Sequence, residues 1–135
     1  MTVQPDDEAM KASDVMVPHA ISVSPELNLK AVANTLVTNG ISAVPVIDLN
    51  NRIVGIISEA DLMRQVSGGE HTARLRGRKA EDVMTRQVIT VDPDTSLQEI
   101  ANLIEKHRIK RVLVVKDGTL VGVVSRANIV QALLR

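Results

Sequence analysis

Two short segments carry a serine followed three residues later by a residue with a side-chain oxygen. The first is Ser58 with Asp61, in IISEAD, and the second is Ser125 with Asn128, in VVSRAN. This spacing suits the start of a helix, where free backbone N–H groups attract hydrogen-bond acceptors and anions. A carboxylate offers two acceptor oxygens, whereas an amide offers one oxygen and an N–H donor. The segments therefore predict two binding sites of unequal chemistry, or two helix caps that differ harmlessly at an exposed position.

Other residues that perform chemistry are scarce. The chain has no cysteine, and its three histidines, His19, His71 and His107, lie far apart without the spacing of metal ligands. No nucleophile stands beside a base, so we expect no catalytic residue, no metal site and no obligatory cofactor. The sequence predicts a protein that is not an enzyme.

Composition narrows the class further. The 135 residues are 44% hydrophobic and 24% charged, and no apolar run reaches the length of a membrane span. The start, MTVQPDDEAMK, lacks the features of a signal peptide, so we expect a cytoplasmic protein without membrane insertion. The absence of Phe, Tyr and Trp removes the platforms on which bases usually stack, which disfavours a nucleic-acid partner.

The net charge is zero but unevenly distributed. Residues 1–68 carry 4 basic and 8 acidic residues, and residues 69–135 carry 12 and 8. The segment SGGEHTARLRGRK is glycine-rich and then basic, which predicts a linker. Its basic side chains suit an anion, although charge in a linker usually serves solubility. They are Arg74, Arg76, Arg78 and Lys79.

The chain contains an internal duplication. A shift of 68 residues aligns DVM at 14–16 with DVM at 82–84. In all, this shift gives 13 identical residues in 35 aligned positions. A shift of 67 then matches VGIIS at 54–58 with VGVVS at 121–125. We expect a first repeat with an N-terminal lead segment, a basic linker and a second repeat. Their predicted bounds are 1–68, 69–79 and 80–135.

Each repeat predicts a short helix, a brief strand, a helix, two strands and a last helix. Apolar residues at helical spacing predict helices from Leu29 and from Leu97, and Thr95 with Gln98 lie at capping-box spacing before the second. Strands are predicted in AVPVID, RIVGII, RVLVVK and TLVGVV, and Asp117-Gly118 between the last two is a strong hairpin signal. We therefore predict an α+β fold. Repeats of about 55 residues are marginal alone, so the two should form one compact module.

These features resemble a pair of CBS domains, the tandem module named after cystathionine β-synthase. The resemblance rests on both DVM segments, on Pro25 and Pro93 after the first strands, on GISAVPV at 40–46 and on the SxxD of GIISEAD, and it extends from Lys11 to Leu134. It implies two β-α-β-β-α repeats packed through their sheets as a pseudo-twofold pair with two clefts. The chain is similar in particular to bacterial CBS proteins that often also carry a BON domain.

Members of this family bind AMP, ADP, ATP or S-adenosylmethionine in the clefts, and they regulate an enzyme, channel or transporter. The resemblance therefore implies a regulatory module with an adenosine nucleotide as its ligand, a homodimer shaped as a disc, and a regulated protein that the sequence does not identify. The alternative is a structural dimerisation module without a small-molecule ligand.

For the first cleft, the resemblance implies that Asp61 accepts hydrogen bonds from both ribose hydroxyls and that Ser58 helps to hold phosphate. Ser22, on the first strand, is expected to touch the ligand. Gly40 is expected to allow close backbone approach. The expected wall of the base pocket consists of Gly40, Ile41, Ser42, Ala43 and Pro45.

The second cleft departs from this pattern. Asn128 follows Ser125 in place of an aspartate, which predicts a cleft that is weaker, altered in preference or empty. RIKRVL replaces GISAVP, and its basic residues are expected either to neutralise a phosphate tail or to form a solvated charge cluster. The expected ligand residues are Thr90, Arg108, Lys110, Arg111, Ser125 and Asn128. The repeated Met16 and Met84 predict core packing.

Overall fold

The structure, a computed structural model, describes residues 10–67 and 74–135 and forms two compact units. The middle unit is Ile21–Val88, and the terminal unit combines residues 10–20 with Ile89–Arg135. The lead segment of the first repeat thus packs with the second repeat. Residues 69–73 of the expected linker lie outside the described residues.

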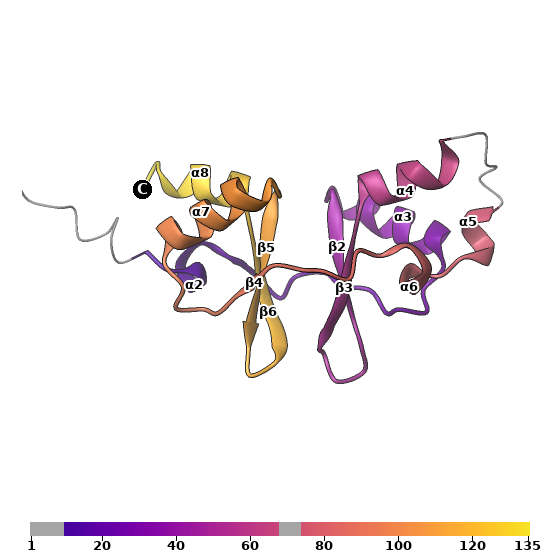
Figure 1. The fold of residues 1–135 in the computed structure, drawn as a ribbon, viewed down its shortest axis with the longest axis horizontal. Helices are drawn as coiled ribbons and strands as arrows, with labels where there is room; N and C mark the ends of the chain where they lie inside the picture. Colours follow the sequence, from indigo (N-terminus) through magenta and orange to yellow (C-terminus); the bar gives the residue numbers. More distant parts are fainter. Residues whose placement is uncertain (1–9, 68–73) are drawn as a thin grey trace, which may run out of the picture. The chain divides into compact units, whose positions relative to one another are not determined.

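The middle unit is built on an antiparallel hairpin of β2 (Ala43–Ile47) and β3 (Ile53–Ser58). Single bridges extend it on both sides, since Val23 pairs with Val46 in parallel and Thr85 pairs with Ile56 in antiparallel. The brief first strand expected at Ser22 is therefore reduced to one bridge. Within this unit the longer helices lie on one side of the strands (Figure 1). The helices are α3 (Leu29–Asn39), α4 (Glu59–Val66), α5 (Arg74–Gly77) and α6 (Ala80–Val83).

The terminal unit repeats this arrangement as a four-stranded sheet in the order β1-β6-β5-β4. The outer strands are short, and β4 is parallel to β5 while the other pairs are antiparallel. The strands are β1 (Val17–Pro18), β4 (Thr90–Val91), β5 (Arg111–Lys116) and β6 (Thr119–Ser125). The helices are α2 (Ala12–Val15), α7 (Leu97–His107) and α8 (Arg126–Ala132). The predicted α+β class is confirmed.

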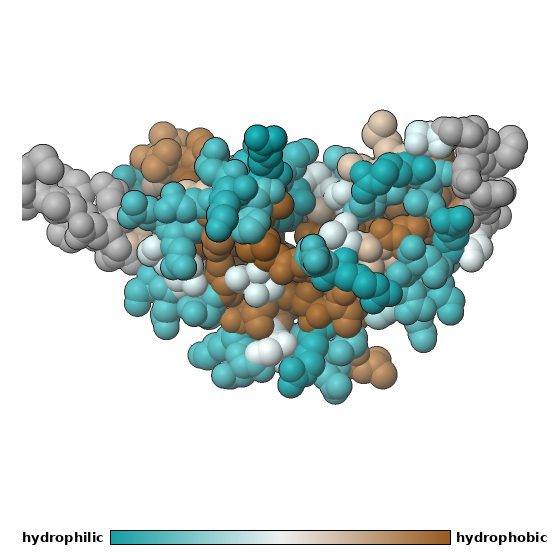
Figure 2. Space-filling model, viewed as in Figure 1, coloured by the Kyte–Doolittle hydropathy of each residue, from teal (hydrophilic) through white to brown (hydrophobic). Residues whose placement is uncertain are grey.

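Each unit has its own apolar core between helices and strands. The middle core includes Leu29 and Val32 of α3 with Val44 and Val46 of β2, all fully buried. The terminal core includes Ile100 of α7 with strand residues such as Val112, Val114 and Val124. On the face shown in Figure 2, hydrophobic residues gather over the strands while hydrophilic residues cover much of the helices.

Local signals set the ends of these elements. Asn28 caps α3 and Ser96 caps α7, each accepting a backbone N–H from three residues ahead. The expected cap at Thr95 is wrong by one residue, because the Thr95 hydroxyl accepts the N–H of Asp92 in the preceding turn instead. The hairpin at Asp117 and Gly118 is confirmed, and both residues have positive φ.

The lead segments of the two repeats are exchanged between the units. Ala12, at the start of α2, donates its N–H to Thr95 in the terminal unit, and Ala80, at the start of α6, donates to Leu27 in the middle unit, both at 2.8 Å. Each lead segment therefore belongs in sequence to one repeat and packs in the unit formed by the other repeat.

The methionine that follows each lead helix packs over a glycine of the unit that it joins. A Cβ at Gly55 would lie 2.6 Å from the Met84 sulfur, and one at Gly122 would lie 2.5 Å from the Met16 sulfur. The core role predicted for both methionines is confirmed, since each packs against the core of its unit. The repeated glycines leave the space that each thioether fills.

Candidate functional site

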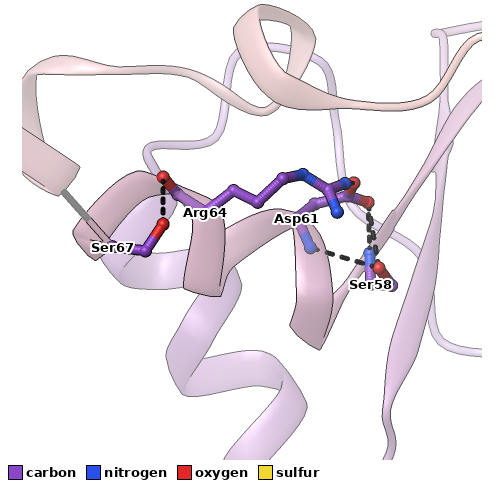
Figure 3. Close-up of polar contacts among 4 residues, drawn as sticks. All are labelled: Ser58, Asp61, Arg64 and Ser67. Carbon is purple, nitrogen blue, oxygen red and sulfur yellow. Dashed lines mark hydrogen bonds and ion pairs between the residues drawn. The ribbon is translucent and has the colours of Figure 1, made fainter.

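The end of β3 and the start of α4 form a closed hydrogen-bonded ring at Ser58 and Asp61 (Figure 3). The Ser58 N–H donates to Asp61 Oδ2 at 2.8 Å, and the Asp61 N–H donates to Ser58 Oγ at 3.2 Å. The Ser58 hydroxyl also lies 3.1 Å from Asp61 Oδ2. This is a capping box, which satisfies backbone donors that a helix start leaves unpaired. Asp61 is only 5% exposed, so the box holds a nearly buried carboxylate.

Arg64 completes this site. Its guanidinium forms an ion pair with Asp61 Oδ1, the oxygen that the capping box does not use (Figure 3). Arg64 was not among the residues expected from the sequence, although a carboxylate and an arginine three residues apart on a helix are a recognised pair. The site therefore contains one buried carboxylate with both oxygens engaged by groups of its own helix and cap.

The expected wall segment lies directly beside this ring. Glu59 at the start of α4 donates its N–H to the Ser42 carbonyl at 2.9 Å, and Ala43 pairs with Ser58 across the hairpin. Ser22 precedes Val23, whose N–H donates to the Pro45 carbonyl at 3.0 Å. Side chains alternate along a strand, so Ala43 and Pro45 point to the face opposite that of the core residues Val44 and Val46. The structure thus brings the expected residues of the first cleft to one end of the β2–β3 hairpin.

Gly40 and Ile41 have identifiable roles in the fold. Gly40 ends α3 with φ of 61°, in the left-handed region, and Ile41 donates its N–H to Leu36 at 3.0 Å. A Cβ at Gly40 would meet no described atom within 4 Å. Backbone conformation, rather than close approach by another protein segment, is thus what the fold requires of Gly40.

The terminal unit has the same ring with an amide. The Ser125 N–H donates to Asn128 Oδ1 at 2.8 Å, and the Asn128 N–H donates to Ser125 Oγ at 3.1 Å. The position of Arg64 is taken by Gln131, and no contact between the Gln131 and Asn128 side chains occurs among the described residues. The charged pair of the middle unit is therefore replaced by two neutral residues.

The terminal unit carries basic residues at the end of α7, at the start of β5 and at the start of α8. Arg108 ends α7 with φ of 53°, in the left-handed conformation that Gly40 adopts in the middle unit. Lys110 accepts the N–H of Arg126 at 2.9 Å through its carbonyl, and Arg111 pairs with Ser125 across β5 and β6. Thr90 pairs with Leu113 on the other side of β5. Arg126, at the first position of α8, is a fourth basic residue here, and the sequence analysis did not select it.

A surface depression of about 380 Å³ lies elsewhere in the terminal unit. Thr90 is the one expected ligand residue among the described residues that line it, and three carboxylates would repel a phosphate there. We therefore place the candidate site at the serine rings. The lining residues are Thr90, Val91, Asp92, Thr95, Glu99, Leu103, Val115, Asp117 and Gly118.

Residues 10–67 and 74–135 contain no group of three His, Cys, Asp or Glu side chains that could hold a metal ion. None of their helices combines the length and apolar character of a membrane span.

Comparison with protein families gives the classification. The family model described as CBS domain matches residues 12–68 and 80–135. The chain belongs to the CBS-domain family. The resemblance drawn from the DVM, GISAVPV and SxxD motifs is thereby confirmed, and both serine rings lie within matched CBS repeats.

Solved structures of CBS proteins with bound ligands are similar to this chain. The crystal structure of CBSX2 in complex with AMP has a TM-score of 0.79 and 29% identity, covering 92% of this chain and 96% of that one. The CBS domain pair of protein MJ0100, in complex with 5′-methylthioadenosine and S-adenosyl-L-methionine, has a TM-score of 0.82 and 25% identity, covering 93% and 96%.

CBS repeats also occur inside larger proteins. Inosine-5′-monophosphate dehydrogenase of Nitrosopumilus maritimus is 30% identical over 120 residues, which are 88% of this chain but 23% of the length of that relative. The chain thus spans about a quarter of that curated relative.

Proposed function

We propose that this CBS pair is a ligand-sensing regulatory module that binds an adenosine-containing nucleotide through the site at Ser58 and Asp61. The observation that carries the proposal is the nearly buried Asp61 carboxylate, which the capping box fixes at the end of the β2–β3 hairpin. AMP, 5′-methylthioadenosine and S-adenosyl-L-methionine, the ligands of the two similar structures, share an adenosine. Thermal unfolding with AMP, ADP, ATP and S-adenosylmethionine identifies the preferred ligand.

Asp61 suits the ribose of such a ligand. A carboxylate accepts hydrogen bonds only, and two neighbouring hydroxyls donate two. The first turn of α4 also carries Glu59, so its local charge favours neutral hydroxyl donors over a phosphate beside Asp61. We therefore assign the diol to Asp61 and give Ser58 the task of holding this carboxylate in place.

The aliphatic segment beside the ring suits the base. Ala43 and Pro45 lie on the face of β2 opposite Val44 and Val46, where both are buried, and Ile41 and Ser42 connect them to the end of α3. Because the chain has no aromatic residue, a purine would rest on these apolar side chains rather than stack on a ring. Ser22, on the neighbouring segment, adds a hydroxyl within the same unit.

The site of the terminal unit would have a different preference. Asn128 has one acceptor oxygen, and the capping box already uses it. Arg111 pairs with Ser125, and Lys110 is bonded to the neighbouring Arg126. Arg108 at the end of α7 adds a third positive charge to the unit, and Thr90 adds a hydroxyl on β4. We propose that this site recognises the phosphates of a ligand more strongly than its ribose.

The regulatory part of the proposal follows the family. Ligand occupancy would be transmitted to a partner domain or protein, which no motif of the sequence identifies. A cytoplasmic location is consistent with a chain that has no cysteine for disulfides.

We also propose a homodimer. Helix α4 exposes Met63 and Val66. At the equivalent positions of the duplication, α8 exposes Val130 and its C-cap residue Leu133 is also exposed. Figure 2 shows hydrophobic residues at the α8 end of the terminal unit. Exposed apolar residues repeated on two helices favour burial against another protein surface, and we assign that surface to a second copy.

Thermal unfolding with added ligand tests the function. A ligand that binds only the folded protein at 100 times its Kd stabilises by about 2.7 kcal/mol, which raises Tm by roughly 8 °C for a chain of this size. We expect a shift of this order with at least one of AMP, ADP, ATP and S-adenosylmethionine, and a smaller one with guanosine monophosphate as the matched control.

The same experiment separates the alternative. A structural dimerisation module without a small-molecule ligand would show the same Tm with and without all four ligands, and that result would reject the sensing function. A second check uses absorbance, since a protein without Trp or Tyr absorbs little at 260 nm and a bound purine dominates the spectrum of the purified protein.

A further inference from the structure

The two oxygens of the Asp61 carboxylate have different partners. Oδ2 accepts both the backbone N–H and the hydroxyl of Ser58, at 2.8 and 3.1 Å, and so serves the helix cap. Oδ1 is paired with the guanidinium of Arg64 (Figure 3). Each carboxylate oxygen has about two acceptor positions, so Oδ2 is filled and Oδ1 is the oxygen with which a ligand hydroxyl would interact.

The duplicated unit shows that the cap does not need the Arg64 contact. Asn128 supplies one oxygen to Ser125, Gln131 stands where Arg64 would be, and α8 still begins directly after the serine, as α4 does. The ion pair is therefore an addition specific to the middle unit, made on the oxygen that the fold leaves over.

Arg64 and Asp61 differ in their exposure. The Arg64 side chain is 65% exposed, whereas that of Asp61 is 6% exposed. An arginine in this position can turn into water without uncovering the core, while the carboxylate remains fixed by its cap. Water screens the pair on the side of the exposed guanidinium, so we expect its loss to change an equilibrium by about fivefold.

We propose that Arg64 competes with the ligand for Asp61. Its guanidinium pairs with Asp61 Oδ1 in the free protein and is displaced when a vicinal diol binds. This inference rests on the proposed function, because it assigns the diol to Asp61. Arg64 thereby lowers the affinity of the middle unit for a ribose and makes that affinity depend on salt, since salt weakens the ion pair that the diol must replace.

Adenosine is the probe that isolates this effect, because it has the diol but no charge. Calorimetry would measure the Kd of adenosine for the unchanged chain and for R64Q, at about 0.02 M and 0.5 M salt. R64Q introduces the residue type that the second repeat has at the equivalent position, Gln131. We expect R64Q to bind adenosine about two- to fivefold more tightly at low salt. The difference should shrink at high salt, through tighter binding by the unchanged chain.

Two further variants serve as controls. R64K keeps the charge and should restore part of the salt dependence, which a purely structural role of Arg64 would not do. R52Q removes a positive charge from the exposed β2–β3 turn of the same unit and should bind adenosine as the unchanged chain does. Thermal unfolding of each variant without ligand confirms that it is folded.

The outcomes distinguish the two proposals. Equal or weaker adenosine binding by R64Q, or the same salt response in all variants, overturns the role of Arg64 while AMP binding by the unchanged chain keeps the sensing function. Binding of AMP but not of adenosine by R64Q also overturns the role of Arg64 and keeps the sensing function. Absence of binding of adenosine and of all four ligands, AMP, ADP, ATP and S-adenosylmethionine, to every variant overturns the sensing function and the role of Arg64 together.

Discussion

Asp61 and Asn128 make the same hydrogen bond in the two units, since each accepts at 2.8 Å the backbone N–H of the serine three residues before it. The shared bond is the requirement of the fold. What distinguishes the two residues is the second oxygen of Asp61, which pairs with Arg64 and has no equivalent in the terminal unit. The difference between the repeats at this position is therefore a difference in available chemistry rather than in structure.

The first prediction concerns the stability of Asp61 variants. Asp61→Asn should lower the free energy of unfolding by less than about 1 kcal/mol, because the amide keeps the cap and the ion pair that is lost has a largely exposed arginine. Asp61→Ala leaves the Ser58 N–H without its acceptor and should cost about 1–3 kcal/mol. Urea denaturation measures both. Equal losses for the two variants would show that the cap does not depend on this side chain.

The second prediction concerns the glycines beneath the methionines. Gly55→Ala should lower the free energy of unfolding by about 1–3 kcal/mol, the usual cost of overpacking. The new Cβ would lie 2.6 Å from the Met84 sulfur and 2.9 Å from the Thr85 carbonyl oxygen. Gly77→Ala is the matched control, because a Cβ there meets no described atom within 4 Å. If both variants unfold at the same urea concentration, Met84 does not restrict position 55.

The third prediction exchanges the residues that end α3 and α7. Gly40 and Arg108 both adopt the left-handed conformation, which costs a residue with a side chain about 1 kcal/mol relative to glycine. Gly40→Ala should therefore destabilise the chain by about this amount, and Arg108→Gly should stabilise it similarly. Denaturation curves that move in the same direction for both variants would contradict the prediction.

Much of this fold could be predicted from the sequence because the signals are local and repeated. The apolar spacing from Leu29 and from Leu97 predicted helices α3 and α7, and Asp117-Gly118 predicted a hairpin. The SxxD and SxxN segments indicated helix starts at Ser58 and Ser125, which the structure has. Duplication strengthened each of these signals, since a pattern found twice in one order is seldom accidental.

The remainder depends on contacts between segments that are distant in sequence. No local pattern states that Ala12 donates to Thr95, so the exchange of lead segments between units could not be read from the repeats. The cap of α7 moved from Thr95 to Ser96 because the Thr95 hydroxyl accepts a backbone N–H in the preceding turn. The role of Arg64 was not predicted because the motif contains only residues 58 and 61. A charged residue one helical turn further is typical of a solvent-exposed surface.

The fourth prediction concerns the proposed dimer. Met63 and Val130 occupy equivalent positions on α4 and α8 and are 69% and 61% exposed. Replacing both with lysine should shift the chain from dimer to monomer, because charged residues are costly at the buried centre of an interface. Light scattering during size-exclusion chromatography measures the mass. Val37→Lys on the exposed face of α3 is the control, and a monomeric unchanged chain would contradict the dimer.

The central claim, that Asp61 recognises a ribose diol, is tested most directly by the affinities of AMP and 2′-deoxy-AMP for the unchanged chain and for Asp61→Asn. A hydrogen bond to a charged group contributes about 1.5–3 kcal/mol, so the unchanged chain should prefer AMP by about 10- to 100-fold. In Asp61→Asn the preference should fall to about onefold, since no carboxylate remains to distinguish the two ligands. The same preference in both proteins would contradict the claim.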